Sequence, residues 1–163
     1  DGRDLAAALQ TIIEIGDGDA MRAAISDAFP GARLHIESQA GGRFAIEFFQ
    51  EGLLRPLSAA ELSDGTLRYL LLVAALLTPR PPSLMVLNEP ETSLHPDLLP
   101  ALARLIIKAS QECQVWVVSH ARRLISALQE DSECNCIVLE KTLGQTGIVG
   151  QRVLDEPAWH WPD

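Results

Sequence analysis

The chain has 163 residues and is 47% apolar, which is enough to bury the core of one compact domain. Its 22 acidic residues outnumber its 13 lysines and arginines, and the net charge of −9 argues against binding of DNA or an anionic membrane by this chain alone. No apolar run approaches the roughly 18 residues of a membrane span, and the three cysteines form no CxxC pair, so we expect a soluble, cytoplasmic protein with reduced thiols.

Two amphipathic helices and a β-hairpin are predicted for the N-terminal third of the chain. Apolar residues recur at helical spacing over 5–13 and again over 21–29, and Gly16-Asp17-Gly18 separates the two stretches. From residue 33 the apolar period changes to two, and the same pattern returns after Gly41-Gly42. This predicts a hairpin from Arg33 to Phe49.

A short polar motif, Leu62-Ser63-Asp64-Gly65-Thr66, stands directly before a helical stripe that ends near Leu77. A serine and a glycine at a helix start bring a hydroxyl, free N–H groups and the positive helix end to one point, which can bind an anion. The same residues also fit a simple serine N-cap, which is the commoner meaning of such a sequence. Both interpretations stay open at this point.

The stretch Ser83 to Pro96 has the strongest pattern in the chain. Its four apolar residues, 84–87, predict a strand that is buried on both faces. The acidic run Asn88-Glu89-Pro90-Glu91 follows at once and leads into a turn. Because a parallel strand delivers such groups to the carboxyl edge of its sheet, we expect the chemistry of the protein at this edge.

A helix, a strand and a short helix are predicted next. Apolar spacing indicates a helix over 98–109, and the buried strand 115–118 then ends in Ser119-His120. A short helix follows over 124–128. The strand therefore places a histidine at its carboxyl end.

The last part of the chain is predicted to form two more strands. These are expected over 136–140 and 148–153, on either side of a turn at 144–147. Trp159 and Trp161 lie among prolines, and we expect them in a packed or frayed terminus.

In this order, the three motifs resemble those of ABC-type ATPases, in the group that includes SMC, RecF and OLD-type proteins and many bacterial predicted AAA ATPases. Residues 62–66 resemble the signature motif, 84–96 the Walker B segment with its D-loop, and His120 the switch histidine. The resemblance implies an α/β fold, a partial P-loop NTPase with a parallel sheet, flanking helices and a β-hairpin. We expect a segment 1–56 leading into an ATPase-like core, 57–163, with both in one compact unit.

The resemblance also implies roles for single residues. Glu89 corresponds to the general base and His120 to the group that contacts the γ-phosphate. Asn88 stands where the family has the aspartate of the Mg²⁺ shell, so metal binding there is expected to be weak. The candidates of the signature motif would bind the γ-phosphate of a nucleotide held by the opposite subunit; they are Leu62, Ser63, Asp64, Gly65 and Thr66. The candidates of the D-loop, Ser93 and His95, would lie at the dimer interface.

No Gly-x4-Gly-Lys-Ser/Thr sequence occurs in the chain, so the loop that cradles phosphates is absent from it. We therefore expect the C-terminal part of an ATPase that uses ATP and Mg²⁺, with its P-loop lobe upstream. The expected partners are that lobe, a second copy upon ATP binding, and DNA or another protein through the full-length protein. The alternative is a non-catalytic module that binds nucleotide only to dimerise, because Asn88 replaces the aspartate.

The resemblance further implies an order of strands. Strand 84–87 should lie beside strand 115–118, and the missing P-loop strand should lie between 115–118 and 136–140. Because unpaired backbone groups are costly, we expect these last two strands to close on each other, or the slot to be filled by the hairpin or another chain.

Overall fold

The computed structural model describes residues 4–131, 133–142 and 144–150 of the chain. Contacts between residues divide the chain into two compact units, Asp1–Asp131 and Ser132–Asp163. The boundary expected between residues 56 and 57 lies inside the first unit, and this unit also holds every candidate site residue.

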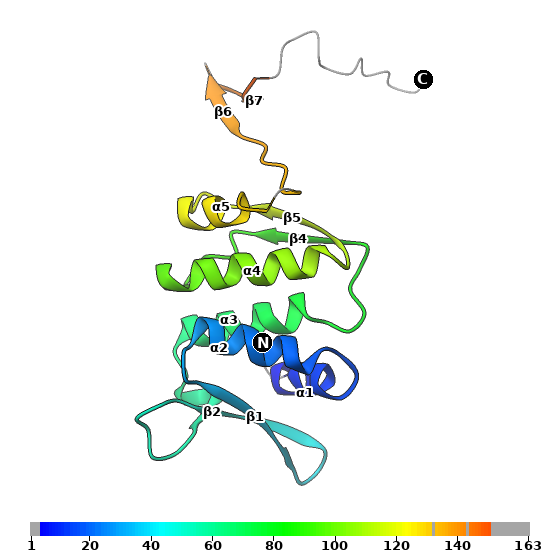
Figure 1. Ribbon diagram of the computed structural model, residues 1–163, viewed down its shortest axis with the longest axis vertical. Coiled ribbons are helices and arrows are strands. Elements are labelled where there is room, and N and C mark those ends of the chain that lie inside the picture. The colour runs from blue at the N-terminus through cyan, green and yellow to red at the C-terminus, as the bar shows by residue number, and fades with distance from the viewer. Residues whose placement is uncertain (1–3, 132, 143, 151–163) are drawn as a thin grey trace. The chain divides into compact units, whose positions relative to one another are not determined.

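Three helices form the centre of the first unit, and they contact one another in pairs. They are α1 (Leu5–Ile15), α2 (Gly18–Ala28) and α3 (Asp64–Leu76). The side chain of Asp17 caps α2 by accepting a hydrogen bond from the backbone N–H of Ala20 at 2.8 Å. Within this unit, the hairpin of residues 33–49 lies on one side of the three helices, and α4 (Leu99–Ser110) lies on the other (Figure 1). The two predicted N-terminal helices are confirmed.

The predicted hairpin is also present, as β1 (Arg33–Gln39) and β2 (Arg43–Phe49). The two strands pair antiparallel over their whole length, and the short β3 (Leu57–Ser58) adds to β2. Gly41 and Gly42 have φ angles of 82° and 72° between the strands. Glycine adopts this left-handed backbone without steric cost, which explains why the chain turns there.

Two parallel strands carry the candidate site. β4 (Leu84–Asn88) pairs with β5 (Gln114–Val118) residue for residue, and α4 (Leu99–Ser110) connects them after a short turn, η2 (Pro96–Leu98). The helix α5 (Arg122–Leu128) follows β5. The structure therefore confirms the predicted pairing of strand 84–87 with strand 115–118.

The β4–β5 sheet has one covered face and one open face. The covered face packs against the core through Met85, Leu87, Val115 and Val117. The open face is apolar but accessible, with exposed fractions of 41% for Leu84, 58% for Val86, 58% for Trp116 and 57% for Val118. The prediction that these strands are buried on both faces is wrong for the described residues, because helices cover the sheet from one side only.

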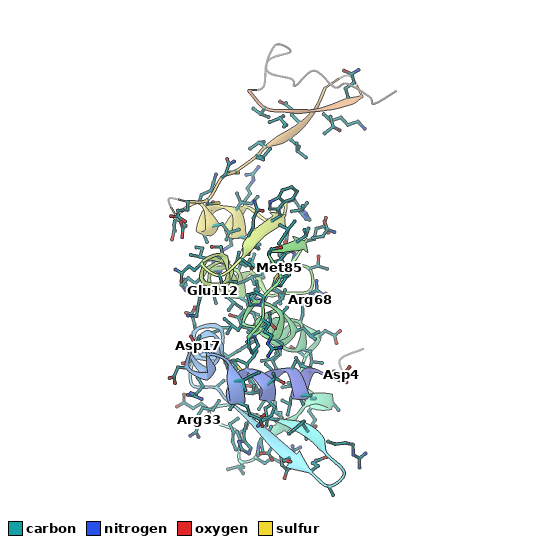
Figure 2. The ribbon with its side chains drawn as sticks, turned by 90° about the vertical axis from the view of Figure 1, so that its right-hand side faces the viewer. Asp4, Asp17, Arg33, Arg68, Met85 and Glu112 are labelled. Atoms are coloured by element: carbon teal, nitrogen blue, oxygen red, sulfur yellow. The ribbon has the colours of Figure 1, made fainter. Side chains whose placement is uncertain are left out.

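The core of the first unit lies between the hairpin, the helices and the covered sheet face (Figure 2). The ring of Phe29 meets those of Phe48 and Tyr69 edge to face, with centroids 5.6 and 5.5 Å away. The guanidinium of Arg104 on α4 donates two 2.8 Å hydrogen bonds to the carboxylate of Asp27 on α2. These contacts hold the site-bearing strands and helices to the N-terminal layer.

The second unit contains a hairpin of β6 (Leu139–Thr142) and β7 (Gln145–Ile148). β6 begins and ends later than the predicted strand 136–140, and β7 begins and ends earlier than the predicted strand 148–153. Thr142 pairs with Gln145, and Gly144 has a φ of 89° between them. Gly147, expected in the turn, lies in β7 instead. Residues 151–153 and the tryptophans at 159 and 161 lie outside the described residues.

The slot beside β5 is not filled by the N-terminal hairpin. Within the first unit, β4 and β5 form one two-stranded sheet and the hairpin belongs to a separate sheet. Filling by the hairpin was therefore a wrong prediction, whereas closure by strand 136–140 or by another chain stays a prediction. No helix among the described residues has the length and apolar character needed to cross a membrane.

Candidate functional site

The carboxyl ends of β4 and β5 meet at one edge of the sheet. Asn88 is the register partner of Val118, and the N–H of Glu89 donates a 2.8 Å hydrogen bond to the carbonyl of Val118. The residues that follow each strand, Glu89 on one side and Ser119-His120 on the other, therefore start at the same level. The predicted convergence of these two segments is present.

His120 lies against two carboxylates. Its Nδ1 atom is 3.6 Å from Oε1 of Glu89 and 3.8 Å from Oε1 of Glu91. The side chains of His120 and Glu89 are 79% and 49% exposed, so both can reach a ligand or a water molecule from solvent. An accessible carboxylate beside an imidazole can accept a proton from water and respond to a nearby anion.

Glu91 differs from Glu89 because its side chain is only 9% exposed. Its Oε1 atom accepts hydrogen bonds from the Ser119 hydroxyl at 2.6 Å and from the His120 N–H at 3.3 Å. Burial raises the pKa of the Glu91 carboxyl, but the hydrogen bonds from Ser119 and from backbone N–H groups outweigh it and leave the pKa below its usual value. Glu91 therefore remains ionised at neutral pH.

The turn after β4 has an unusual backbone. Glu89 and Ser93 have φ angles of 45° and 68°, which non-glycine residues adopt only at a cost. Pro90 is fully buried between them, and the N–H groups of Thr92 and Leu94 bond back to carbonyls earlier in the turn. The surrounding packing fixes this turn, so the chain leaves β4 in one defined direction.

Residues 62–66, the predicted signature segment, form the start of α3. Ser63 caps the helix, since its Oγ accepts a 3.1 Å hydrogen bond from the Thr66 N–H and lies 2.9 Å from Oγ1 of Thr66. The simple N-cap interpretation is therefore confirmed, and the phosphate role stays a prediction. Leu62 packs partly against the core, whereas the carboxylate of Asp64 is exposed in the first turn.

Gly65 brings the predicted signature segment against the predicted D-loop of the same chain. A Cβ atom at this position would lie 2.9 Å from the backbone carbonyl oxygen of Ser93, which is closer than real Cβ contacts. Only glycine allows the two segments to approach this far. Two predicted site segments thus touch before any partner subunit is added.

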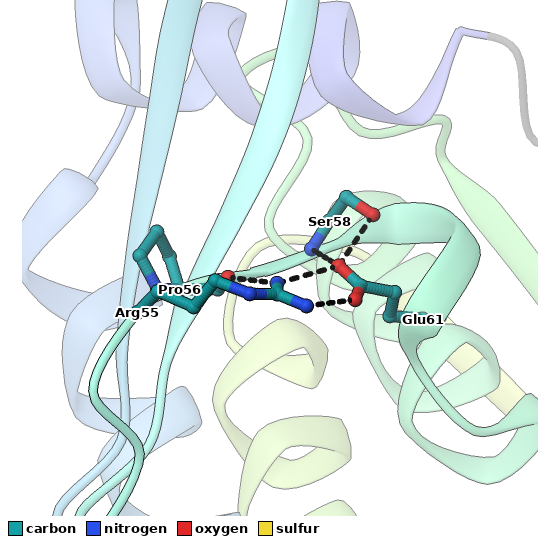
Figure 3. Close-up of polar contacts among 4 residues, drawn as sticks. All are labelled: Arg55, Pro56, Ser58 and Glu61. Atoms are coloured by element: carbon teal, nitrogen blue, oxygen red, sulfur yellow. Dashed lines mark hydrogen bonds and ion pairs between the residues drawn. The ribbon is translucent and has the colours of Figure 1, made fainter.

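A cluster of hydrogen bonds fixes the chain just before the signature (Figure 3). Arg55 binds Glu61 in bidentate fashion, with distances of 3.1 and 2.6 Å, and also donates to the carbonyl of Pro56 at 3.0 Å. The backbone N–H and the hydroxyl of Ser58 both donate to Oε2 of Glu61, at 3.0 and 2.9 Å. These contacts set how the chain passes from β3 into α3.

The end of the D-loop is tied to α5. The ring of His95 accepts a 3.3 Å hydrogen bond from the Asp97 N–H and so caps η2. The carboxylate of Asp97 pairs with Arg123 at 3.0 Å, at the start of α5. His95 is 73% exposed, so its observed contacts leave it accessible for the interface role that remains a prediction.

The donor set at the sheet edge suits Mg²⁺ only in part. Asn88 and Glu89 offer exposed oxygen atoms, and Mg²⁺ commonly takes one or two protein oxygens and keeps several waters. An amide, however, contributes no negative charge. In the part of the chain that the structure describes, no three His, Cys, Asp or Glu side chains are grouped to hold a metal ion.

Sequence reasoning overlooked several contacts of this site. The bonds of Glu91 to Ser119 and the pairing of Asp97 with Arg123 join segments that lie more than twenty residues apart. Ser119 directly precedes the histidine and is polar at the end of an apolar strand, so its position was a usable signal. The burial of Glu91 had no such signal, because it depends on the left-handed turn at Glu89.

Solved structures of SMC head domains have the same fold. One, described as "Structural biochemistry of ATP-driven dimerization and DNA stimulated activation of SMC ATPases", has a TM-score of 0.65 at 16% identity and covers 95% of this chain and 92% of its own. The Smc head domain with a coiled coil and joint from Pyrococcus yayanosii has a TM-score of 0.66 at 16% identity, over 90% of this chain and 28% of that one. The SMC head domain from Thermotoga maritima has a TM-score of 0.57 at 18% identity, over 93% and 52%.

These structures confirm the α/β fold of an SMC-like ATPase head, and the chain corresponds to only part of the longer ones. Among curated protein sequences none matches this chain. One protein family, described as "AAA domain, putative AbiEii toxin, Type IV TA system", matches residues 12–126, which include all candidate site residues and well over half of the chain. The chain therefore belongs to this AAA-domain family, and the resemblance to ABC and SMC-type ATPases is confirmed.

Proposed function

We propose that this chain is the part of an ATP-hydrolysing switch that carries the signature, Walker B, D-loop and switch-histidine segments. One observation carries the proposal: the parallel pairing of β4 and β5 places Glu89 and His120 within 3.6 Å of each other at one sheet edge. Membership of an AAA-domain family and the SMC head fold support a nucleotide as the ligand.

The residues of the site take the following roles in this proposal. Glu89 accepts the proton of the attacking water, because its carboxylate is accessible and lies at the end of a fixed strand. His120, which is 79% exposed, contacts the terminal phosphate and changes its contacts when that phosphate leaves. Bound Mg²⁺ would neutralise phosphate charge near Asn88 and Glu89.

The start of α3 takes part across a dimer. The first N–H groups of a helix have no partner within the helix, and those of α3 begin beside the exposed Ser63. The signature residues would thus hold the terminal phosphate of a nucleotide bound mainly by the second copy, and Ser93 and His95 would lie at the interface. The related structure described with ATP-driven dimerisation supports this arrangement.

Two further partners follow. The open face of β4–β5 is where an upstream P-loop lobe of the same protein would pack, since the chain itself has no phosphate-cradling loop. DNA or a partner protein would bind through the full-length protein, as the descriptions of related SMC heads with DNA stimulation or bound ScpA suggest for those proteins. The protein would work in the cytoplasm.

A second candidate function is nucleotide-gated dimerisation without turnover. Asn88 favours it, because the amide replaces the charge that would otherwise help to hold Mg²⁺. In this version the site would close on ATP and open only by exchange.

Single-turnover hydrolysis by the full-length protein tests both functions. Glu89→Gln should abolish hydrolysis and preserve ATP-dependent dimerisation, because the amide keeps the shape of the side chain but cannot accept the proton. Wild-type hydrolysis at the rate of Glu89→Gln would contradict the switch. If only Asn88→Asp then restores hydrolysis, the dimerisation module is the function.

A further inference from the structure

We propose that Glu91 is a positioning residue, whose buried carboxylate holds the loop of Ser119 and His120 so that the imidazole faces Glu89. The idea rests on the proposed function, since it assigns a role within the same site. It concerns a residue that lies within the segment 84–96 but to which the resemblance to the family assigned no role.

The contacts of Glu91 reach each residue between β5 and α5. Its Oε1 atom accepts directly from the Ser119 hydroxyl and the His120 N–H. The Ser119 oxygen in turn accepts a 3.1 Å hydrogen bond from the Ala121 N–H, at a helix start that has no side-chain cap of its own. One carboxylate oxygen therefore organises residues 119–121.

The burial of the Glu91 side chain distinguishes a positioning role from that of a general base or a metal ligand, which must be accessible. The Glu91 side chain is 9% exposed and its Oε1 atom already has two donors, whereas Glu89 is 49% exposed. Oε2 of Glu91 is buried and has no hydrogen-bond partner among the described residues. Burying a carboxylate that forms hydrogen bonds through only one oxygen lowers the stability of the fold. This cost favours a functional reason for the presence of Glu91.

The same geometry predicts which substitutions matter. The carbonyl oxygen of a glutamine at 91 can accept from both Ser119 and His120, so Glu91→Gln keeps the ties. Glu91→Ala removes them, and Ser119→Ala removes the strongest of them with less change in the core. Glu112, which is exposed in the turn after α4, provides a matched control as Glu112→Ala.

The first measurement is steady-state hydrolysis by the full-length protein. Glu91→Ala and Ser119→Ala should lower kcat about tenfold or more with KM for ATP changed less than about twofold, while Glu91→Gln and Glu112→Ala stay near wild type. An unchanged kcat in Glu91→Ala would overturn the proposal. A loss that is reversed by excess Mg²⁺ would overturn it as well, because it would make Glu91 a metal ligand.

The second measurement is amide hydrogen exchange without nucleotide, which does not depend on hydrolysis. Residues 119–121 should exchange faster in Glu91→Ala and Ser119→Ala than in wild type, and at the wild-type rate in Glu91→Gln. Equal exchange rates of residues 119–121 in the wild type and all variants would refute the proposal that Glu91 holds this loop. If the wild type never hydrolyses ATP but exchange changes as stated, the proposed function fails while the positioning of the loop by Glu91 stands.

Discussion

Gly65 is the point at which the predicted signature segment and the predicted D-loop of one chain meet. Replacing it with alanine would place a Cβ atom 2.9 Å from the carbonyl oxygen of Ser93, in a turn whose backbone is already left-handed. We expect Gly65→Ala to lower the free energy of unfolding by about 1–3 kcal/mol, as overpacking does elsewhere. Urea denaturation of the chain measures this difference.

Gly18 provides the control for that substitution. It lies in the first turn of α2, and a Cβ atom there would make only ordinary contacts, the nearest at 3.5 Å to the guanidinium of Arg22. Gly18→Ala should leave stability unchanged or raise it by less than about 1 kcal/mol. An equal loss in both variants would show that contact with Ser93 is not the cause.

Among single residues, the sequence was informative where a residue follows a regular strand. Glu89 directly follows β4 and His120 comes two residues after the end of β5, so their proximity could be predicted from the pattern of the two strands. The contacts of Glu91 and Gly65 could not, because they depend on the positive φ angles of Glu89 and Ser93. Glutamate and serine, the residue types at positions 89 and 93, give no indication of a positive φ angle.

The connection from β3 into α3 has a pH dependence that can be worked out. Hydrogen bonds from Arg55, and then from Ser58, lower the pKa of Glu61 to about 2 from an ordinary 4.5. A lowered pKa in the folded state stabilises the fold above the ordinary value, and this contribution is lost as the pH falls from about 4.5 to about 2.

We therefore expect Glu61→Gln to be slightly less stable than wild type at neutral pH, and the difference to vanish near pH 2. The effect should be small because the side chains are exposed and screened by water. Denaturant midpoints of both proteins across this pH range provide the measurement. A difference that grows toward low pH would have the wrong sign for this mechanism.

At the level of elements, the ends of helices and strands could be predicted where a single group of structure-breaking residues lies between two elements. Gly16 and Asp17 separate α1 from α2, and the glycine pair at 41–42 makes the turn of the first hairpin. The second hairpin offers two glycines, Gly144 and Gly147, and the turn uses the first while the second lies in β7. The sequence does not distinguish them, because either can adopt a left-handed backbone.

At the scale of the whole molecule, the open face of β4–β5 exposes apolar side chains to solvent. Exposed apolar side chains beside an unpaired strand edge favour association. We expect the chain alone to self-associate with rising concentration in sedimentation experiments, and Trp116→Lys to weaken this. Ile15→Lys, at a 67% exposed apolar residue on α1, is the control and should have little effect.

A strictly monomeric chain at high concentration would contradict this expectation. Equal weakening of self-association by Ile15→Lys and Trp116→Lys would also contradict it, because the contact would then not be specific to the open face of β4–β5. The sequence pattern of β4 and β5 predicts burial on both faces, and the open face shows that the cover is not supplied by residues 4–131.

The open face also gives the molecule a spectroscopic reporter. Trp116 is 58% exposed on this face, whereas Trp159 and Trp161 are the other indoles of the chain. With those two replaced by phenylalanine, the emission maximum reports the polarity around Trp116 alone. Covering the sheet by another lobe would move that emission to the blue, so assembly of the protein could be followed in real time without an attached dye.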